Sequence, residues 1–166
     1  MNSRKLFDFT QYIHDLAAHN KLARENNFRP CAASGMGGVT DMLSEMRQWP
    51  AFIVTDDLVT GGTIQKGGAW FQRRTFTVHI VARYRQGYED DRKQKAQLCR
   101  ELLRQLQSRL LRDEAMLNNN LAYIDLSRMP VADVGQFFLE GCTGLYFQVN
   151  FDEPVNIAYN AEEWDD

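Results

Sequence analysis

The chain has 166 residues, 44% of them hydrophobic and 11% aromatic, with a formal net charge of −3 and a pI near 5.6. This length and apolar content suffice for one core, so we expect a single domain over residues 1–166. A mildly acidic chain is not the typical carrier of a specific nucleic-acid site. Its apolar runs, such as AFIV at 51–54, are far shorter than the roughly 20 residues that span a bilayer. The start, MNSRKLFDFTQ, lacks the apolar stretch of a signal peptide.

The cysteines and two of the histidines do not form a metal-binding pattern. Cys31, Cys99 and Cys142 are widely spaced, with no CxxC pair, which favours three reduced thiols over a zinc site. His14 and His19 fall on a predicted helix, where a separation of five residues places them about 140° apart around the axis. We therefore predict neither a metal site nor a cofactor.

Residues 1–47 are predicted to form a helical segment. Apolar residues recur every three or four positions between Ser3 and Asn26, at Leu6, Phe9, Ile13, Leu16 and Ala17, which indicates an amphipathic helix with Ser3 as its N-cap. NNFRP at 26–30 is expected to stop this helix, and CAASGMGG at 31–38 to be a flexible connection. A second, short helix follows, with Thr40 or Asp41 as its cap, and ends before Pro50.

Strand patterns begin at Pro50. The continuous apolar run at 51–54 is typical of a strand buried on both faces. TFTVHIVARY at 75–84 alternates with period two, which predicts a second strand with His79 on its polar side, as a surface or interface residue. Between them, two Gly-Gly pairs in Asp57–Phe71 predict a protruding hairpin or a long loop with a mobile tip.

A long helix follows a turn at Arg85–Tyr88. The acidic trio EDD at 89–91 favours a helix start, and leucines at helical spacing continue from Leu98 to Leu110 with Cys99 on the same side. NNN at 118–120 ends the helix. Strands are then expected at 121–126, within 127–140 with an interruption at Pro130, and beyond Gly144 as LYFQVNF.

The predicted fold is α+β, in the order α-α-β-β-α-β-β. A mostly antiparallel sheet of four to five strands carries the long helix on one face, and a helix precedes it near the N-terminus. Residues 48–153 form this sheet-and-helix core, and 154–166 form an acidic tail that frays or docks on another subunit.

No combination of residues predicts catalysis. SGMGGVTDM at 34–42 lacks the order of a P-loop or a dinucleotide-binding loop, and the glycines around Lys66 have no helix after them. The paired carboxylates at 56–57 and 89–91 stand at the ends of elements, where turn and cap roles account for them.

One basic and aromatic group is a candidate interface, made of Arg73, Arg74, Arg83, Tyr84 and Arg85. Arginine is enriched where planar contacts to carboxylates are made between proteins, and NAEEWDD at 160–166 offers such carboxylates. A solvated face of the sheet remains the alternative interpretation.

The pattern resembles a known family. WPAFIV at 49–54, the Gly-rich polar stretch, TFTVHIVARY, the helix start YEDD and the final strand GLYFQVNF together resemble the phage tail terminators, the group similar to minor tail protein U. The resemblance covers residues 48–153.

The resemblance implies a structural virion protein without enzymatic activity or cofactor. Its subunits would be assembled in the host cytoplasm into a ring, expected to be a hexamer, that closes the tail tube and engages the head connector or neck. The inter-strand loop would contact the tube or neck through Gly61, Gly62, Lys66, Gly67 and Gly68. Two alternatives remain: another neck or tail completion protein of similar fold, and a small ligand-binding or nucleotide-using enzyme built on the Gly-rich turns.

Overall fold

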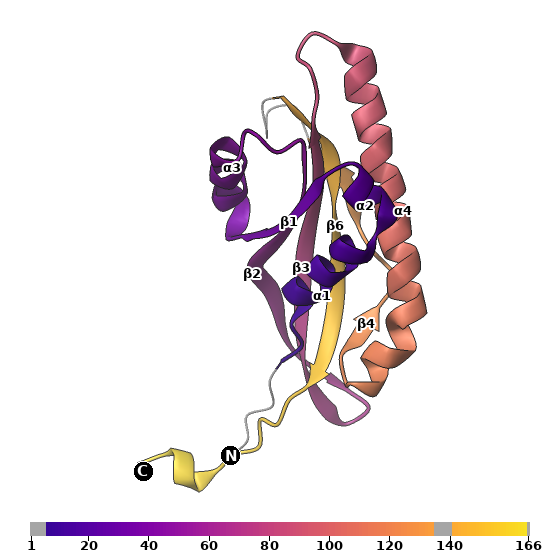
Figure 1. Ribbon diagram of the computed structural model, residues 1–166. Coiled ribbons are helices and arrows are strands. Elements are labelled where there is room, and N and C mark those ends of the chain that lie inside the picture. Colours follow the sequence, from indigo (N-terminus) through magenta and orange to yellow (C-terminus); the bar gives the residue numbers. More distant parts are fainter. Residues whose placement is uncertain (1–5, 135–140, 166) are drawn as a thin grey trace.

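A computed structural model describes residues 6–134 and 141–165 (Figure 1). The helices are α1 (Phe9–His19), α2 (Lys21–Glu25), α3 (Gly35–Glu45), α4 (Glu89–Asn119) and the short 3-10 turn η1 (Ala161–Glu163). The strands are β1 (Phe28–Ala33), β2 (Ala51–Lys66), β3 (Ala69–Arg83), β4 (Tyr123–Asp125), β5 (Val131–Asp133) and β6 (Cys142–Pro154). This composition confirms the α+β class.

The strands form one mixed sheet in the order β1-β2-β3-β6-β4, with β5 also paired to β6. β1 runs parallel to β2, and the other pairs are antiparallel. Within the described residues the sheet has six strands, one or two more than predicted, because β1 was not recognised in the sequence.

The segment predicted as a helix stop and flexible connection is strand β1. Phe28 pairs with Ala51 and Ala33 with Asp56, so β1 runs alongside the first half of β2. Pro30 is tolerated because β1 lies at the end of the strand order, where a missing N–H need not break a ladder. β1 has only six residues, and their burial is mixed. It therefore contains too few repeats for an alternating apolar pattern to be recognised in the sequence.

Helix α3 begins at the glycines that the sequence analysis assigned to a connector, and neither Thr40 nor Asp41 is its cap. The Gly35 N–H donates to Asp56 Oδ1 at 2.8 Å, and the Ser34 hydroxyl donates to Asp57 Oδ1 at 2.6 Å. Carboxylates from the end of the β1–β2 ladder thus bind the start of the helix, a tertiary contact that compensates for the low helix propensity of glycine.

The long helix predicted for residues 3–26 is divided in two. Asp8 caps α1, accepting from the Gln11 N–H at 2.9 Å, whereas the predicted cap Ser3 lies outside the described residues. Asn20 ends α1 and caps α2, accepting from the Ala23 N–H at 2.8 Å. Four residues of the predicted apolar stripe, Phe9, Ile13, Leu16 and Ala17, are buried as expected, whereas Leu6 precedes α1 and is exposed.

The main core lies between one face of the sheet and helices α1 and α4 (Figure 1). The even-numbered residues of β3 from Phe76 to Ala82 meet the buried side of α4, whose acidic start, leucine stripe and end at the asparagines are as predicted. The run AFIV is buried on both faces, as expected: Ile53 belongs to the main core, whereas Phe52 and Val54 lie in a second cluster with α3.

His79 is not the surface residue that its place in the alternation predicted. It is 1% exposed and lies in a cross-strand row with Val54 and Tyr146, its ring centroid 5.6 Å from that of Tyr146. Burial lowers the pKa of its imidazole because the charged form loses hydration. The second face of the sheet is therefore partly core, which strand alternation alone cannot reveal.

The first two strands after α4 are shorter than the patterns suggested. LAYIDL yields the three-residue β4, and β5 follows Pro130. Residues 135–140, which the predicted interrupted strand included, lie outside the described part of the chain. β6 is the long final strand that was predicted, beginning slightly earlier at Cys142.

Candidate functional site

The predicted inter-strand segment is a regular β-hairpin. β2 and β3 pair continuously from Thr60–Thr75 to Lys66–Ala69, so of the two predicted alternatives the hairpin is right and the long loop is wrong. Gly67 and Gly68 have φ of +56° and +82°. Positive φ at both turn positions gives the turn type whose twist matches that of paired strands.

The two glycines of the first Gly-Gly pair, Gly61 and Gly62, have different surroundings. A Cβ on Gly61 would lie 1.9 Å from the Arg73 carbonyl oxygen, whereas one on Gly62 would meet nothing within 4 Å. The ladder is irregular between Asp56 and Thr60, just before this pair. Gly61 therefore permits a close approach of the two strands after a bulge.

The outer half of β2 has an open edge. From Thr60 to Lys66, β2 pairs with β3 on one side, and no strand within residues 6–134 and 141–165 pairs with its other side. The side chains of Leu58 and Val59 are exposed in the irregular stretch just before this edge. An edge without a strand partner, close to exposed apolar side chains, is a surface on which another strand can pair.

Arg73 and Arg74 bind carboxylates of the neighbouring strand β6. Arg73 donates from Nε to Asp152 Oδ1 at 2.7 Å and from Nη2 to Oδ2 at 2.8 Å, and Lys66 donates to the same carboxylate. Arg74 donates from Nε to Glu153 Oε2 at 2.8 Å and from Nη2 to the Phe7 carbonyl at 2.7 Å. Both arginines thus hold the outer end of the sheet together within one chain.

The two acceptors are buried, with exposed fractions of 3% for Asp152 and 4% for Glu153. Burial raises the pKa of Asp152, but the hydrogen bonds from Arg73 and Lys66 outweigh it and hold the pKa below its ordinary value. No sequence pattern indicates this cluster, because DEP at 152–154 is typical of the polar end of a strand.

Arg83 lies at the other end of β3, against the last turn of α3. Its Nε donates to the Trp49 carbonyl at 3.0 Å, and its Nη2 donates to the carbonyls of Leu43 and Met46. Unpaired carbonyls and the negative end of the macrodipole attract a cation at a helix C-terminus. Arg83 therefore anchors α3 to the sheet.

Tyr84 and Arg85 follow the end of β3. The Tyr84 N–H donates to the Gly141 carbonyl at 3.0 Å, and the exposed Arg85 guanidinium lies 4.8 Å from the centre of the Tyr88 ring. The five predicted interface residues consequently occupy opposite ends of one strand and do not form a single patch. Their role between subunits stays a prediction.

A groove between α1 and α4 contains polar residues that the sequence analysis did not select. The Tyr12 hydroxyl donates to Asp113 Oδ2 at 3.0 Å, and Arg109 Nε donates to the same oxygen at 2.8 Å. The groove has a volume of about 450 Å³. Burial, together with the bond to Asp113, raises the pKa of Tyr12. Arg109 and Asp113 are one turn apart on α4, but only tertiary structure, which no local pattern specifies, brings Tyr12 to them.

Other chemical features of the described residues are limited. Residues 6–134 and 141–165 contain no group of three or more His, Cys, Asp or Glu side chains placed to hold a metal ion. Burial raises the pKa of the Cys31 and Cys99 thiols to about 12. No helix in the described part of the chain is both long and apolar enough to cross a membrane.

Comparison with known proteins gives no match: no family model matches the sequence, and no curated protein matches it.

Proposed function

We propose that the chain is a structural ring subunit of the tail terminator type, which closes a tail tube and engages the head connector or neck. The observation that carries the proposal is the exposed β2–β3 hairpin with its open edge. In this role the hairpin contacts the neighbouring subunit or the tube, and the subunit needs no catalytic centre and no cofactor.

The strand order supports a ring. In the outer half of the sheet, β2 lies at one end and β4 at the other, with β3 and β6 between them. A closed ring uses heterologous contacts, in which one surface of a subunit binds a different surface of the next. An open edge at one end of the sheet and short strands at the other provide two such surfaces.

The test is direct imaging of the assembly. The purified full chain, alone and with a tail tube protein, is studied by sedimentation velocity and negative-stain electron microscopy. We expect a closed hexameric ring that caps the tube. A strictly monomeric species at high concentration, with no ring beside tube protein, contradicts the proposal and leaves the alternatives of a monomeric neck protein or an enzyme.

A matched pair of variants tests the role of the hairpin. Leu58 and Leu111 are exposed to similar degrees, 62% and 58%, but Leu58 lies just before the open edge and Leu111 on α4. Leu58→Lys is expected to weaken ring formation at least tenfold with no change in melting temperature, and Leu111→Lys to leave it unchanged. Equal effects of the two variants would remove the hairpin edge from the interface.

A further inference from the structure

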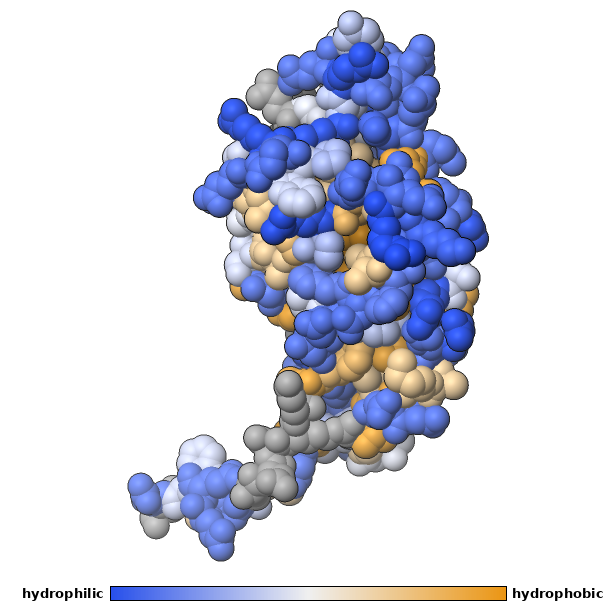
Figure 2. All heavy atoms as spheres, in the orientation of Figure 1, coloured by the Kyte–Doolittle hydropathy of each residue, from blue (hydrophilic) through white to orange (hydrophobic). Residues whose placement is uncertain are grey.

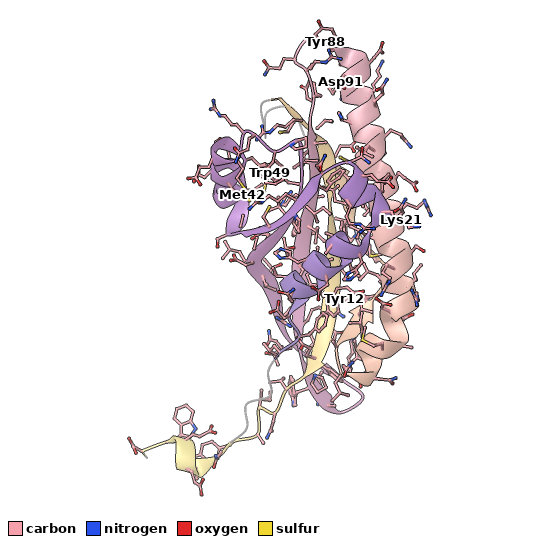
Figure 3. The ribbon with its side chains drawn as sticks, viewed as in Figure 1. Tyr12, Lys21, Met42, Trp49, Tyr88 and Asp91 are labelled. Atoms are coloured by element: carbon pink, nitrogen blue, oxygen red, sulfur yellow. The ribbon has the colours of Figure 1, made fainter. Side chains whose placement is uncertain are left out.

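Arg29 and Arg83 contact Trp49, and Arg47 lines a groove with Arg83; we call Arg29, Arg47, Trp49 and Arg83 the Trp49 cluster. The Arg29 guanidinium lies 4.5 Å from the centre of the Trp49 ring, and Arg83 donates to the Trp49 carbonyl at 3.0 Å. Arg47 is exposed near the end of α3 and lines a groove of about 590 Å³ together with Arg83 and Gln86. Figure 3 shows Trp49 beside α3.

The cluster contains no acidic partner, unlike six other arginine sites. Among the described residues, ion pairs with carboxylates are formed by Arg73, Arg74, Arg92, Arg100, Arg104 and Arg109. Among the described residues, no carboxylate forms an ion pair with Arg29, Arg47 or Arg83, and the partners of Arg83 are carbonyls and a thiol. Its positive charge is therefore available to an external anion.

The segment after β6 has the complementary chemistry. We call residues 156–165 the arm, which Figure 1 shows running away from the sheet and Figure 2 shows as a separate lobe. It contains Glu162, Glu163 and Asp165 and no basic residue. Ile157 and Trp164 are 50% and 62% exposed, and Trp164 stacks on Tyr159 with ring centroids 6.4 Å apart. Acidic and aromatic groups thus stand together on an extended segment.

The arm is too short to reach the Trp49 cluster of its own chain. Pro154 pairs with Phe71 and Cys142 with Arg83, so the two ends of this ladder are about 40 Å apart at ~3.3 Å per residue. Six extended residues, the turn η1 and the step to Trp164 carry the backbone of Trp164 at most about 31 Å from Pro154. Even fully extended, Trp164 is limited to about 36 Å.

We propose that the arm of one copy docks on the Trp49 cluster of a second copy. The acidic side chains of the arm pair with Arg29 and Arg47, and Trp164 lies against the cluster, where arginine and aromatic faces stack on one another. The contact is heterologous, because it joins one end of a subunit to the other end of its neighbour. It rests on the proposed function to the extent that both require copies of this chain to meet.

A phosphate backbone is the competing occupant of a cationic surface with a tryptophan. Charge favours the arm: the whole chain has a net charge of −3, which repels nucleic acid at long range. The arm contains acidic residues and no basic residue. Aromatic and charged groups also occur together on both partners, as at protein interfaces.

Complementation between two full-length variants tests the proposal. The arm variant is Glu162→Lys with Glu163→Lys, and the cluster variant is Arg47→Glu, which spares the contacts of Arg83 to α3. The controls are Glu25→Lys and Arg112→Glu, which reverse exposed charges elsewhere. Sedimentation velocity measures the association of each variant and of equimolar mixtures, and circular dichroism checks that each is folded.

We expect each variant alone to associate at least tenfold more weakly than wild type, and the controls to behave as wild type. Mixing the two variants restores pairwise association, because the intact arm of one meets the intact cluster of the other. Failure of the mixture to associate overturns the proposal. So does tight binding of a DNA oligonucleotide that Arg47→Glu abolishes and the arm variant leaves unchanged, since phosphate would then be the ligand.

The outcomes separate this inference from the proposed function. If both variants form rings as well as wild type does, the arm does not dock on the cluster, although the ring proposal stands. If the variants complement each other but wild type forms open chains without rings on a tube, the docking stands and the tail terminator role falls.

Discussion

The two ends of strand β3 present the same residue types to different environments. At the outer end, Arg73 and Arg74 bind buried carboxylates of β6. At the inner end, Arg83 binds the carbonyls of α3 and a loop. Ion pairs between strands stabilise the outer end. The inner end is stabilised by burial, because helices cover both faces of the sheet there.

This difference shows how one long strand can serve both core and surface. The inner half of β3, from Phe76 to Ala82, is largely buried, whereas the half nearer the hairpin tip is half-buried or exposed. Buried apolar contacts fix the inner half, so most substitutions there should unfold the chain. Changes at the hairpin should instead alter local order and assembly.

The largest expected effect is at the buried face of α4, which covers β3. Leu102→Asp places an unpaired carboxylate at a fully buried position, which costs about 4 kcal/mol or more of unfolding free energy. Leu111→Asp, on the exposed side of the same helix, should change stability by less than about 0.5 kcal/mol. Urea unfolding of both variants measures the difference, and an unchanged Leu102→Asp protein would show that the helix placement is wrong.

The next largest effect is at the outer end, where Arg74 is the ion-pair partner of Glu153. Arg74→Met leaves the carboxylate of Glu153 buried without its cation, which costs about 3 kcal/mol. Adding Glu153→Leu should recover much of this loss, because a buried pair can be replaced by apolar groups at little cost. A double-mutant cycle by chemical denaturation gives the coupling, and additive losses would contradict a direct pair.

The elements with long periodic patterns were predictable from the sequence. The alternation of β3 and β6 and the leucine stripe of α4 each repeat several times, so chance matches are averaged out. β1 and the start of α3 were missed for the opposite reason. β1 is stabilised by pairing with β2, and α3 begins where Asp56 and Asp57 bind its first residues, contacts that are distant in the sequence.

The candidate site was less predictable than the fold. The sequence identified Arg73 and Arg83 as members of a basic group, but it could not show that their partners come from β6 and α3. The Trp49 cluster was likewise hidden, because Arg29 and Arg83 are far apart in sequence and each reaches Trp49 only through the pairing of β1 and β3 with β2. Charge pairing depends on tertiary contacts, which no local period encodes.

A smaller effect is expected at the inner end. Arg83→Glu removes the donors to the end of α3 and places a negative charge there, which should cost about 2 kcal/mol. Hydrogen exchange should show faster opening of α3 while α4 keeps its protection. Arg85→Glu is the matched control, since Arg85 is exposed beyond the strand. Equal protection of α3 in wild type and Arg83→Glu would mean that Arg83 does not hold the helix.

The smallest expected effect is the pH dependence of the outer cluster. The pKa of Asp152 lies below its ordinary value of 3.8 in the folded chain, so its ionised form contributes stability at any pH above that value. This contribution is lost as the pH falls below 3.8 and through the folded pKa. The gap in unfolding free energy between wild type and Asp152→Asn should therefore be constant near neutral pH and shrink only in strong acid.

Denaturation at a series of pH values from 7 down to the acid limit of folding measures this gap. Asp41→Asn, at an exposed position on α3, serves as the control and should keep a gap within about 0.5 kcal/mol of zero throughout. A gap for Asp152→Asn that widens in acid would mean that the folded chain favours the protonated carboxyl. The burial of Asp152 would then outweigh its bonds to Arg73 and Lys66, and the outer end of β3 would be held by packing, as the inner end is.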